Sequence, residues 1–300
     1  MRTVPERLYP FAGQTISLPG RLRLHYLDEG EGETLLMLHG NPTWSFYYRN
    51  LVLGLRDRYR CVVPDHMGMG RSDRPDDDAY RYTLQRRVDD LEALVERAAI
   101  QLPLTLIAHD WGGMIGMAWA ARDPTRVRRL VLMNTAAFRL PDGTPFPWTL
   151  RLTRTGLGAL LVLRANAFAR GAARFCVTRP MPRDVRRAYL APYDSPRRRL
   201  ATLRFVEDVP LGPEDPAYGL VRQTEERLAR FGSTPTLLLW GERDFVFGQA
   251  FLERWIELLP HAEVERYPDA GHYVLEDRGP DALARIERFL AESAPREPAA

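Results

Sequence analysis

Apolar residues along the chain follow two different spacings. Short apolar or alternating runs bounded by Gly, Pro, Asn and Asp are typical of β-strands, and longer segments with an apolar residue at every third or fourth position are typical of amphipathic helices. The two kinds of segment alternate along the sequence, which predicts an α/β protein with a mostly parallel eight-stranded sheet and helices on both faces. The expected strands cover residues 15–18, 21–28, 35–39, 60–64, 104–108, 129–134, 236–241 and 263–267, and helical spacing is clearest at Leu84, Val88, Leu91, Leu94 and Ala98, and at Leu283, Ile286, Phe289 and Leu290.

This alternation stops between residues 139 and 211. Several prolines near the start of that region end the strand pattern, and the sequence that follows has helical spacing, many arginines and no clear strand. We interpret the region as a helical cap inserted after the sixth core strand, where it would exclude water and shape a substrate pocket. The expected domains are a first part of the core at 1–138, the cap at 139–211 and a second part of the core at 212–300.

Within this cap, residues 150–175 mix apolar side chains with five arginines. The pattern fits an apolar lid or a helix that lies on a membrane surface. It fits more simply a packed cap helix with a solvated arginine face. The tail from Ser293 onward is rich in Ala, Pro and charge, and we expect it to be disordered.

Composition narrows the class of protein. The chain has 300 residues, of which 45% are hydrophobic and 27% charged, as expected for one large globular domain with an insertion. The net charge is only +3, so the basic pI does not indicate a nucleic-acid partner. Every basic residue except histidine is an arginine, which excludes a Schiff-base lysine and a phosphate-loop lysine. No cofactor is expected.

The two cysteines and the termini point to a cytoplasmic enzyme. Cys61 and Cys176 lie in different regions and form neither a disulfide framework nor a metal-ligand pattern, which predicts a reducing compartment. Residues 1–18 lack the apolar core of a signal peptide. No run reaches the ~18 apolar residues of a membrane-spanning helix.

Asp110 is the candidate with the clearest chemistry. It follows the apolar run 104–107 and precedes Trp111, two glycines and a helix of small residues. A strand that enters a helix through a tight turn exposes the side chain at its apex and places backbone N–H groups behind it. A carboxylate there can attack carbon without a base to activate it. The alternative is that Asp110 only caps the helix, as Asp often does.

A covalent ester on Asp110 would need a base if it is released by hydrolysis, and His272 is the candidate. It follows the last expected strand and precedes the final helix, which fits the chain order nucleophile, acid, histidine. Asp244, after strand 236–241, is the candidate that orients it, and Glu242 is the rival. The sixth strand ends in Asn134, which is not an acid. His25 and His261 are interpreted as ordinary core or surface residues.

Two neutral donors are expected to face the nucleophile. Asn41 follows His39-Gly40 at the end of the third strand, and Trp111 lies directly beside Asp110. An amide and an indole N–H that converge on a pocket would stabilise an anion that develops as a carbon–heteroatom bond breaks. The alternative is a turn asparagine and a core tryptophan. Residues 65–72 are interpreted as architecture and not as catalytic machinery.

Together these residues resemble the Asp-nucleophile branch of the α/β-hydrolase fold, over almost the whole chain. The H-D-W-G-G string at 109–113 is similar to that of haloalkane dehalogenases and epoxide hydrolases, and Asn41 with Trp111 and a late acid resembles haloalkane dehalogenase subfamily III. The strings at 39–50, 65–72, 134–138 and 244–247 resemble more closely the β-lactone decarboxylases of bacterial long-chain olefin biosynthesis. The resemblance implies that Asp110, His272 and Asp244 are catalytic and that Asn41 and Trp111 bind the anion.

The activity expected from this resemblance is decarboxylation of a cis-3,4-dialkyl β-lactone to a cis-alkene, with attack at the carbonyl or the alkyl carbon left open. Hydrolytic dehalogenation is the second interpretation. Epoxide hydrolysis is the third, and it would need cap hydroxyls, for which Tyr189, Tyr193 and Tyr218 are available. A non-catalytic binding module is a different class, against which the intact set of candidate residues argues.

The expected partners are a hydrophobic small molecule and no nucleic acid. The resemblance also brings in, as an option, other enzymes of an olefin-biosynthesis assembly. The pattern of residues 150–175 adds peripheral membrane contact through the cap as a second option.

Overall fold

The computed structural model describes residues 3–293, and most of the predicted disordered tail lies outside these residues. It contains an eight-stranded sheet of strand order β1-β2-β4-β3-β5-β6-β7-β8, in which β1–β2 and β2–β4 are antiparallel and the other neighbours are parallel. The predicted mostly parallel sheet is confirmed, and each predicted strand is present within two residues of its expected ends. The strands are β1 (Gln14–Leu18), β2 (Leu22–Glu29), β3 (Thr34–Leu38), β4 (Arg60–Pro64), β5 (Leu104–Asp110), β6 (Val127–Thr135), β7 (Thr236–Gly241) and β8 (Glu263–Tyr267).

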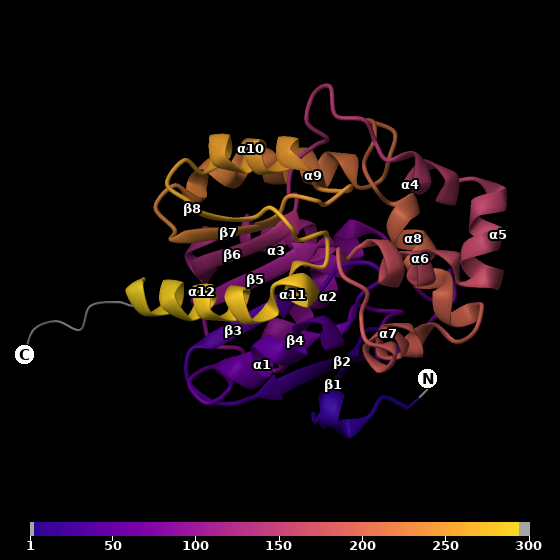
Figure 1. The fold of residues 1–300 in the computed structure, drawn as a ribbon, viewed down its shortest axis with the longest axis horizontal. Helices are drawn as coiled ribbons and strands as arrows, with labels where there is room; N and C mark the ends of the chain where they lie inside the picture. The colour runs from indigo at the N-terminus through magenta and orange to yellow at the C-terminus, as the bar shows by residue number, and fades with distance from the viewer. Residues whose placement is uncertain (1–2, 294–300) are drawn as a thin grey trace, which may run out of the picture.

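Helices cover both faces of the sheet (Figure 1). Alternate residues of a central strand point to opposite faces: Leu36 and Leu38 of β3 belong to one buried cluster, and Leu35 and Met37 belong to the other. The first cluster lies under α2 (Leu84–Arg97), α3 (Trp111–Ala120), α9 (Tyr218–Arg227) and α10 (Gln249–Leu258), and the second lies under α1 (Arg49–Leu55), α11 (Val274–Asp277) and α12 (Gly279–Glu292).

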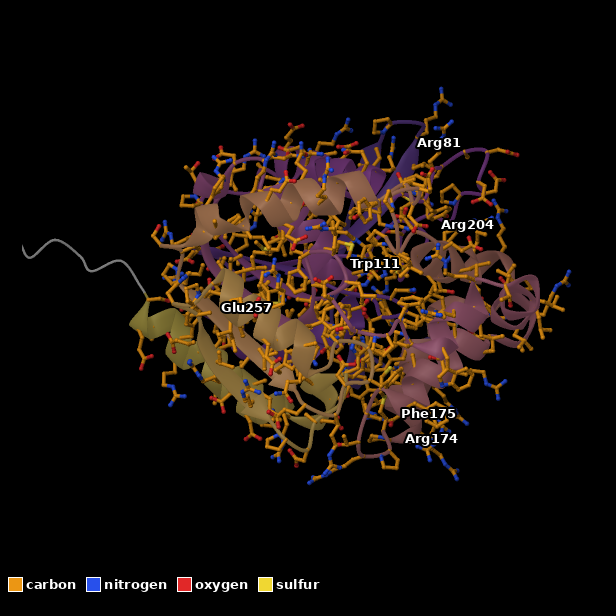
Figure 2. The ribbon with its side chains drawn as sticks, turned by 90° about the horizontal axis from the view of Figure 1, so that it is seen from above. Arg81, Trp111, Arg174, Phe175, Arg204 and Glu257 are labelled. Atoms are coloured by element: carbon orange, nitrogen blue, oxygen red, sulfur yellow. The ribbon has the colours of Figure 1, made fainter. Side chains whose placement is uncertain are left out.

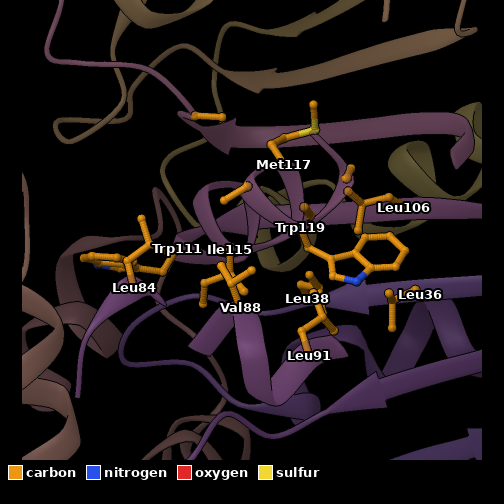
Figure 3. Close-up of a cluster of buried hydrophobic side chains, with 14 of the residues drawn as sticks. Leu36, Leu38, Leu84, Val88, Leu91, Leu106, Trp111, Ile115, Met117 and Trp119 are labelled. Atoms are coloured by element: carbon orange, nitrogen blue, oxygen red, sulfur yellow. The ribbon is translucent and has the colours of Figure 1, made fainter. Parts of the chain in front are cut away.

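Helix α3 is buried on all sides, because every residue from Trp111 to Ala120 except Met114 is buried. Leu84, Val88 and Leu91 of α2 pack against it, and Leu38 and Leu106 close the cluster from the sheet (Figure 3). The helix that starts at the candidate nucleophile is therefore held rigidly against the sheet.

Between β6 and α9 the chain forms short helices and no strand among the described residues. They lie beyond the carboxyl ends of the central strands (Figure 1). The breaks have local causes: Thr155 caps the second of these helices by accepting from the N–H of Gly158, and Asn166, in the left-handed region with φ 54°, separates the second from the third. The helices are α4 (Trp148–Thr153), α5 (Gly156–Ala165), α6 (Ala167–Phe175), α7 (Arg183–Leu190) and α8 (Leu200–Glu207).

The proposed domain boundaries at 138/139 and 211/212 stay a prediction. Within residues 3–293, no helix combines the length and apolar composition needed to cross a bilayer.

Candidate active site

Asp110 lies at a strained turn between β5 and α3. Its backbone has φ 51° and ψ −126°, a conformation that residues other than glycine rarely adopt. The turn is possible because the next residues carry no bulk: a Cβ on Gly112 would lie 1.9 Å from the carbonyl oxygen of Leu38. The hydroxyl of Thr135 donates to the carbonyl oxygen of Asp110 at 2.5 Å. These contacts direct the carboxylate away from the sheet.

Asp110 occupies the position before the first residue of α3, and the orientation of its side chain favours the nucleophile over the alternative of a simple cap. Its side chain makes no capping hydrogen bond to α3. One carboxylate oxygen, Oδ1, accepts from the backbone N–H of Asn41 at 2.6 Å, and the other, Oδ2, lies 3.6 Å from Nε2 of His272. Gly40 permits this approach, because a Cβ there would lie 2.1 Å from Oδ1. The carboxylate is thus oriented by the loop after β3 and by the histidine, and it lines a cavity.

The structure brings His272 and Asp244 together. Nδ1 of His272 lies 2.8 Å from Oδ2 of Asp244, and both residues are buried. The other oxygen of Asp244 accepts from the backbone N–H of Val246 at 2.7 Å. Glu242, the rival acid, instead forms a surface ion pair with Arg266 at 3.2 Å. Asp244 is therefore the acid that faces the imidazole.

Asn134 also belongs to this arrangement, a role that the sequence did not reveal. Its Nδ2 donates to Oδ2 of Asp244 at 2.9 Å and to the carbonyl oxygen of Gly241 at 3.0 Å, and its Oδ1 accepts from the N–H of Gly241. It is fully buried, with φ 35°. The signal available in the sequence was a polar residue directly after the apolar run 130–133.

His109 is a second residue whose contribution the sequence did not reveal. Its Nε2 lies 2.8 Å from the carbonyl oxygen of His272, so this nitrogen carries the proton and donates. Its ring stacks on Tyr47, with centroids 4.5 Å apart. Burial holds the pKa of His109 well below its ordinary value, which keeps the ring neutral. His109 therefore anchors the loop that carries His272.

The ionisation of the central pair follows from its surroundings. Burial alone would lower the pKa of His272, but the charges of Asp244 and Asp110 outweigh it and raise that pKa above its ordinary value. Burial raises the pKa of Asp110, against the opposing effects of His272 and of the backbone N–H groups of Trp111 and Asn41. The neighbouring carboxylates thus favour the protonated ring of His272, and that ring in turn opposes the effect of burial on Asp110.

Asn41 and Trp111 both line the cavity beside Asp110, and both contact helix α8. Nδ2 of Asn41 donates one hydrogen to the carbonyl oxygen of Thr202 at 3.0 Å, which leaves its second N–H free of that bond. The ring of Trp111 packs edge-on against Phe205, with centroids 5.2 Å apart. Helix α8 therefore positions both expected donors. That their N–H groups bind an anion stays a prediction.

The remaining histidines have structural partners. His25 pairs with the buried Asp65 at 2.8 Å, and the exposed His261 contacts the carbonyl oxygen of Thr234. His39 and His66 bond to each other's backbone and ring atoms. Asp65 also accepts from backbone N–H groups within residues 45–71, so the loop 65–72 acts as architecture, as expected from its sequence.

The site opens into a cavity of about 520 Å³. Asp110, His272, Asn41 and Trp111 line it together, and most of its wall is apolar and comes from α4, α5 and α6 and from residues 206–211 and 245–251. Such a cavity fits an apolar ligand whose reactive group meets these polar residues. Within residues 3–293, no group of three or more His, Cys, Asp or Glu side chains is arranged to hold a metal ion.

Comparison with known proteins shows the same architecture. Residues 33–279 match the family model described as alpha/beta hydrolase fold. The chain is 49% identical over 290 residues to the cis-3-alkyl-4-alkyloxetan-2-one decarboxylase of Shewanella oneidensis, covering 96% of this chain and 91% of the relative. It is 35% identical over 294 residues to haloalkane dehalogenase 2 of Mycobacterium tuberculosis, covering 96% and 98%. The crystal structure of an ancestral haloalkane dehalogenase superimposes with a TM-score of 0.85 at 28% identity, covering 93% and 99%.

Proposed function

This chain belongs to the alpha/beta hydrolase family, and we propose that it is a carboxy-lyase that converts cis-3,4-dialkyl β-lactones into cis-alkenes and carbon dioxide. The observation that carries the proposal is the 49% identity, over nearly the whole chain, to a decarboxylase of cis-3-alkyl-4-alkyloxetan-2-ones, which are β-lactones. The site is compatible with this chemistry, because a buried carboxylate faces an apolar cavity large enough for a substrate with two alkyl groups.

We propose that the Asp110 carboxylate attacks the ring carbon that bears the ring oxygen, C4. The C4–O bond breaks, and its electron pair stays on the oxygen, which becomes part of a carboxylate on C3. Attack at the carbonyl carbon is less suitable, because it would leave an alkoxide on C4. An alkene cannot form until that carbon–oxygen bond also breaks, and an alkoxide is a very poor leaving group.

The second step releases both products. The electron pair of the bond between C3 and the carboxylate carbon forms the C3=C4 double bond, carbon dioxide leaves, and the bond from C4 to Asp110 breaks. Its electron pair returns to the carboxylate, so no water and no net proton is consumed. Backside attack places the new C4–O bond opposite the C3–carboxylate bond, because the ring holds the original C–O bond eclipsed with it. The alkyl groups therefore stay on one side, and the alkene is cis.

The neighbouring residues would act on the charge that moves. We propose that Asn41 and Trp111 donate to the oxygen that leaves C4, as neutral donors to a developing anion. His272, with its raised pKa, would place positive charge beside Asp110 and the new carboxylate. Asp244 and Asn134 would hold its ring in position. Asp110, His272 and Asp244 would thus form a triad that stabilises charge in this reaction.

Hydrolytic dehalogenation is the second candidate, favoured by the 35% identity to a haloalkane dehalogenase and by the similar crystal structure. There Asp110 would displace halide, and neutral His272 would activate water to hydrolyse the alkyl ester. The geometry around Asp110 suits dehalogenation as well. We place dehalogenation second because the chain is more similar to the decarboxylase.

The structure does not favour epoxide hydrolysis. Among the described residues, none of the three candidate tyrosines, Tyr189, Tyr193 and Tyr218, is part of the cavity wall. The hydroxyl of Tyr189 donates to Glu276 at 2.5 Å, and that of Tyr193 donates to the carbonyl oxygen of Thr43 at 3.1 Å. The hydroxyls that would activate an epoxide oxygen are engaged elsewhere.

We further propose that the enzyme works in the cytoplasm, in the synthesis of long-chain olefins, beside other enzymes of the same route. The reaction requires an enzyme that forms β-lactones as its supplier. Two buried, unpaired cysteines, Cys61 and Cys176, support a reducing compartment.

The test uses the oxygen atoms of Asp110. The protein is incubated in ¹⁸O-labelled water for many turnovers with a cis-β-lactone and, separately, with a 1-haloalkane, and the peptide containing Asp110 is analysed by mass spectrometry. The lactone should yield equal amounts of cis-alkene and carbon dioxide and leave Asp110 unlabelled. Hydrolytic turnover would label the carboxylate. Release of a 3-hydroxy acid from the lactone, or label in Asp110 with that substrate, would overturn the proposal.

A further inference from the structure

The mouth of the cavity lies in the largest gathering of exposed apolar side chains. Eleven large hydrophobic residues are exposed among the described residues, and six of them also line the cavity: Trp148, Leu152, Leu161, Phe175, Leu211 and Phe245. Leu157 and Leu160 of α5 add to this surface without lining the cavity. The apolar wall of the cavity therefore continues onto the outside of the molecule.

The most exposed members are large. Trp148 is 74% exposed, Phe175 68% and Leu157 63%. Phe175 and Arg174 lie at the outer edge of the molecule, away from Trp111 at its centre (Figure 2). A contiguous apolar surface of this kind is costly in water and usually marks a surface that binds a partner or a membrane.

The charges on helices α4, α5 and α6, which carry most of this surface, have one sign. Between Asp142 and Asp184 the chain has seven arginines and no acidic residue, so the rest of the chain, with a total of +3, carries a net charge of −4. Six of these arginines are exposed, and four of the six, Arg151, Arg164, Arg170 and Arg174, lie on α4, α5 and α6. Positive charge is thus concentrated in the same helices that carry most of the exposed apolar side chains.

We propose that this face, which we call the mouth surface (exposed parts of α4, α5 and α6 with Leu211 and Phe245), docks onto an anionic lipid bilayer. The arginines would pair with lipid phosphates, while their methylene stems and the Trp, Leu and Phe side chains enter the region between headgroups and acyl chains. An interfacial tryptophan beside short amphipathic helices is typical of such a contact.

The proposal deepens the proposed function, on which its second half rests. A β-lactone with two long alkyl groups, and the alkene made from it, dissolve in a bilayer far better than in water. Because the cavity opens through the mouth surface, substrate would enter from the lipid and reach Asp110 without crossing water. An acidic protein partner would meet the same charges, but it would not account for a cavity that opens through the contact itself.

Docking is tested by flotation of the full chain with vesicles, with no substrate present. The wild type should float with phosphatidylcholine vesicles that contain phosphatidylglycerol and should float less with phosphatidylcholine alone. Two double variants weaken the surface: L157Q/L160Q removes apolar side chains that do not line the cavity, and R170E/R174E reverses two exposed charges. R170E/R174E should lower the binding constant at least about 25-fold, because each arginine near an anionic surface contributes about fivefold. L157Q/L160Q should lower it roughly tenfold, because two leucine side chains no longer leave water.

Matched controls carry the same changes elsewhere. L102Q/V264Q removes two exposed apolar side chains, 44% and 36% exposed, that lie outside the mouth surface, and R81E/R230E reverses two exposed arginines outside it. Both controls should float like the wild type. All four variants should keep the wild-type melting temperature and the wild-type rate on a short-chain lactone that dissolves in water.

Three outcomes would overturn the docking proposal: no flotation with either lipid, equal flotation of the mouth-surface variants and the controls, or a dimer that L157Q/L160Q abolishes in a wild type that does not float. The first two exclude lipid docking at this face, and the third assigns it to a second copy of the chain. If the wild type floats as expected but forms no alkene from a soluble lactone, the proposed function fails and the docking surface stands.

Discussion

Asn134 donates a hydrogen bond to Oδ2 of Asp244 at 2.9 Å, and the same oxygen faces Nδ1 of His272 at 2.8 Å. Asn134, near the end of β6, therefore does not take the place of the acid but holds the carboxylate of Asp244 in position. Because Asn134 also bonds to the backbone of Gly241 in both directions, it ties the end of β6 to the end of β7. The position of the imidazole depends on this link between two strands.

We expect Asn134→Ala to lower kcat for the β-lactone roughly tenfold to a hundredfold, because a hydrogen bond to a charged group contributes about 1.5–3 kcal/mol. KM should change little, since Asn134 does not line the cavity. Steady-state kinetics of the purified variant check this, with Asn50→Ala, an exposed asparagine on α1, as the control. A variant that loses thermal stability but keeps kcat would show that Asn134 only joins the strands.

The strands and the nucleophile turn could be predicted because their signals are local. An apolar run such as 104–107, bounded by turn residues, encodes a buried strand, and two glycines after Asp110 indicate that a helix packs closely on the sheet. Asp244 and His272 could be identified in the same way, because each follows a predicted strand closely in the sequence. The strand order could not be read this way, because β4 pairs between β2 and β3 through contacts that no short segment encodes.

Contacts between distant segments escaped prediction for the same reason. Thr202 holds the amide of Asn41 from 161 residues away, and nothing in the sequence around either residue indicates the contact. The tyrosines of the cap were available as hydroxyl donors in the sequence. Only the hydrogen bond from Tyr189 to Glu276 in the structure shows that the hydroxyl of Tyr189 is engaged elsewhere.

Asp110→Asn should abolish turnover and leave the fold intact. The amide has nearly the same shape as the carboxylate but is a poor nucleophile, so the covalent route is lost. Alkene formation measured by gas chromatography should fall to a trace while the melting temperature stays close to that of the wild type. More than a tenth of the wild-type rate, with deamidation excluded by mass spectrometry, would contradict a nucleophilic role.

His272→Ala should affect the two candidate reactions differently. With a haloalkane, Asp110 can still be alkylated, but the ester is not hydrolysed, so one equivalent of halide and a stable adduct are expected. With a β-lactone, alkene should still form, more slowly, because no step removes a proton. Intact-protein mass spectrometry with each substrate checks this. A stable lactone adduct that forms no alkene would show that the step that releases alkene and carbon dioxide needs His272.

The pH profile of the wild type should also depend on the substrate. The pKa of His272 is raised, because its carboxylate neighbours outweigh burial. Hydrolysis of an alkyl ester needs the neutral ring, so that rate should fall as the pH drops through the pKa of His272 in the ester, where Asp244 still raises it and Asp110 no longer does. The lactone rate should persist to lower pH, until Asp110 becomes protonated. Rates measured with both substrates across the same buffers decide this, and coincident acid limbs would refute the difference.

Asn41→Ala and Trp111→Phe should both lower kcat more than they raise KM. Each removes one N–H that we expect to face the developing anion, and loss of one such donor costs on the order of 10²–10³ in rate. A turn residue or a core ring without this role would alter stability and leave kcat nearly unchanged. Kinetics and thermal melts of both variants separate the two cases. Wild-type kcat in both would disprove the anion site.

The final prediction concerns Asp208, which anchors helix α8 by an ion pair with Arg87 at 2.6 Å. Both side chains are buried, and the guanidinium of Arg87 also lies 3.7 Å from the ring centroid of Phe205. Asp208→Asn leaves that charge without its carboxylate, which should destabilise the protein by about 3–5 kcal/mol. Because α8 carries Thr202 and Phe205, which contact Asn41 and Trp111, kcat should fall as well.

Denaturant unfolding and kinetics check this prediction against Arg204→Gln, which removes an ion pair with Asp77 on the surface of the same helix. That control should lose at most about 1 kcal/mol and keep its kcat. The double variant Arg87→Met/Asp208→Leu should recover much of the stability, because no unpaired charge stays buried. If α8 positions the two donors, kcat should recover together with stability. A double variant that is stable but still slow would instead show that the charge of Arg87 acts on the site directly.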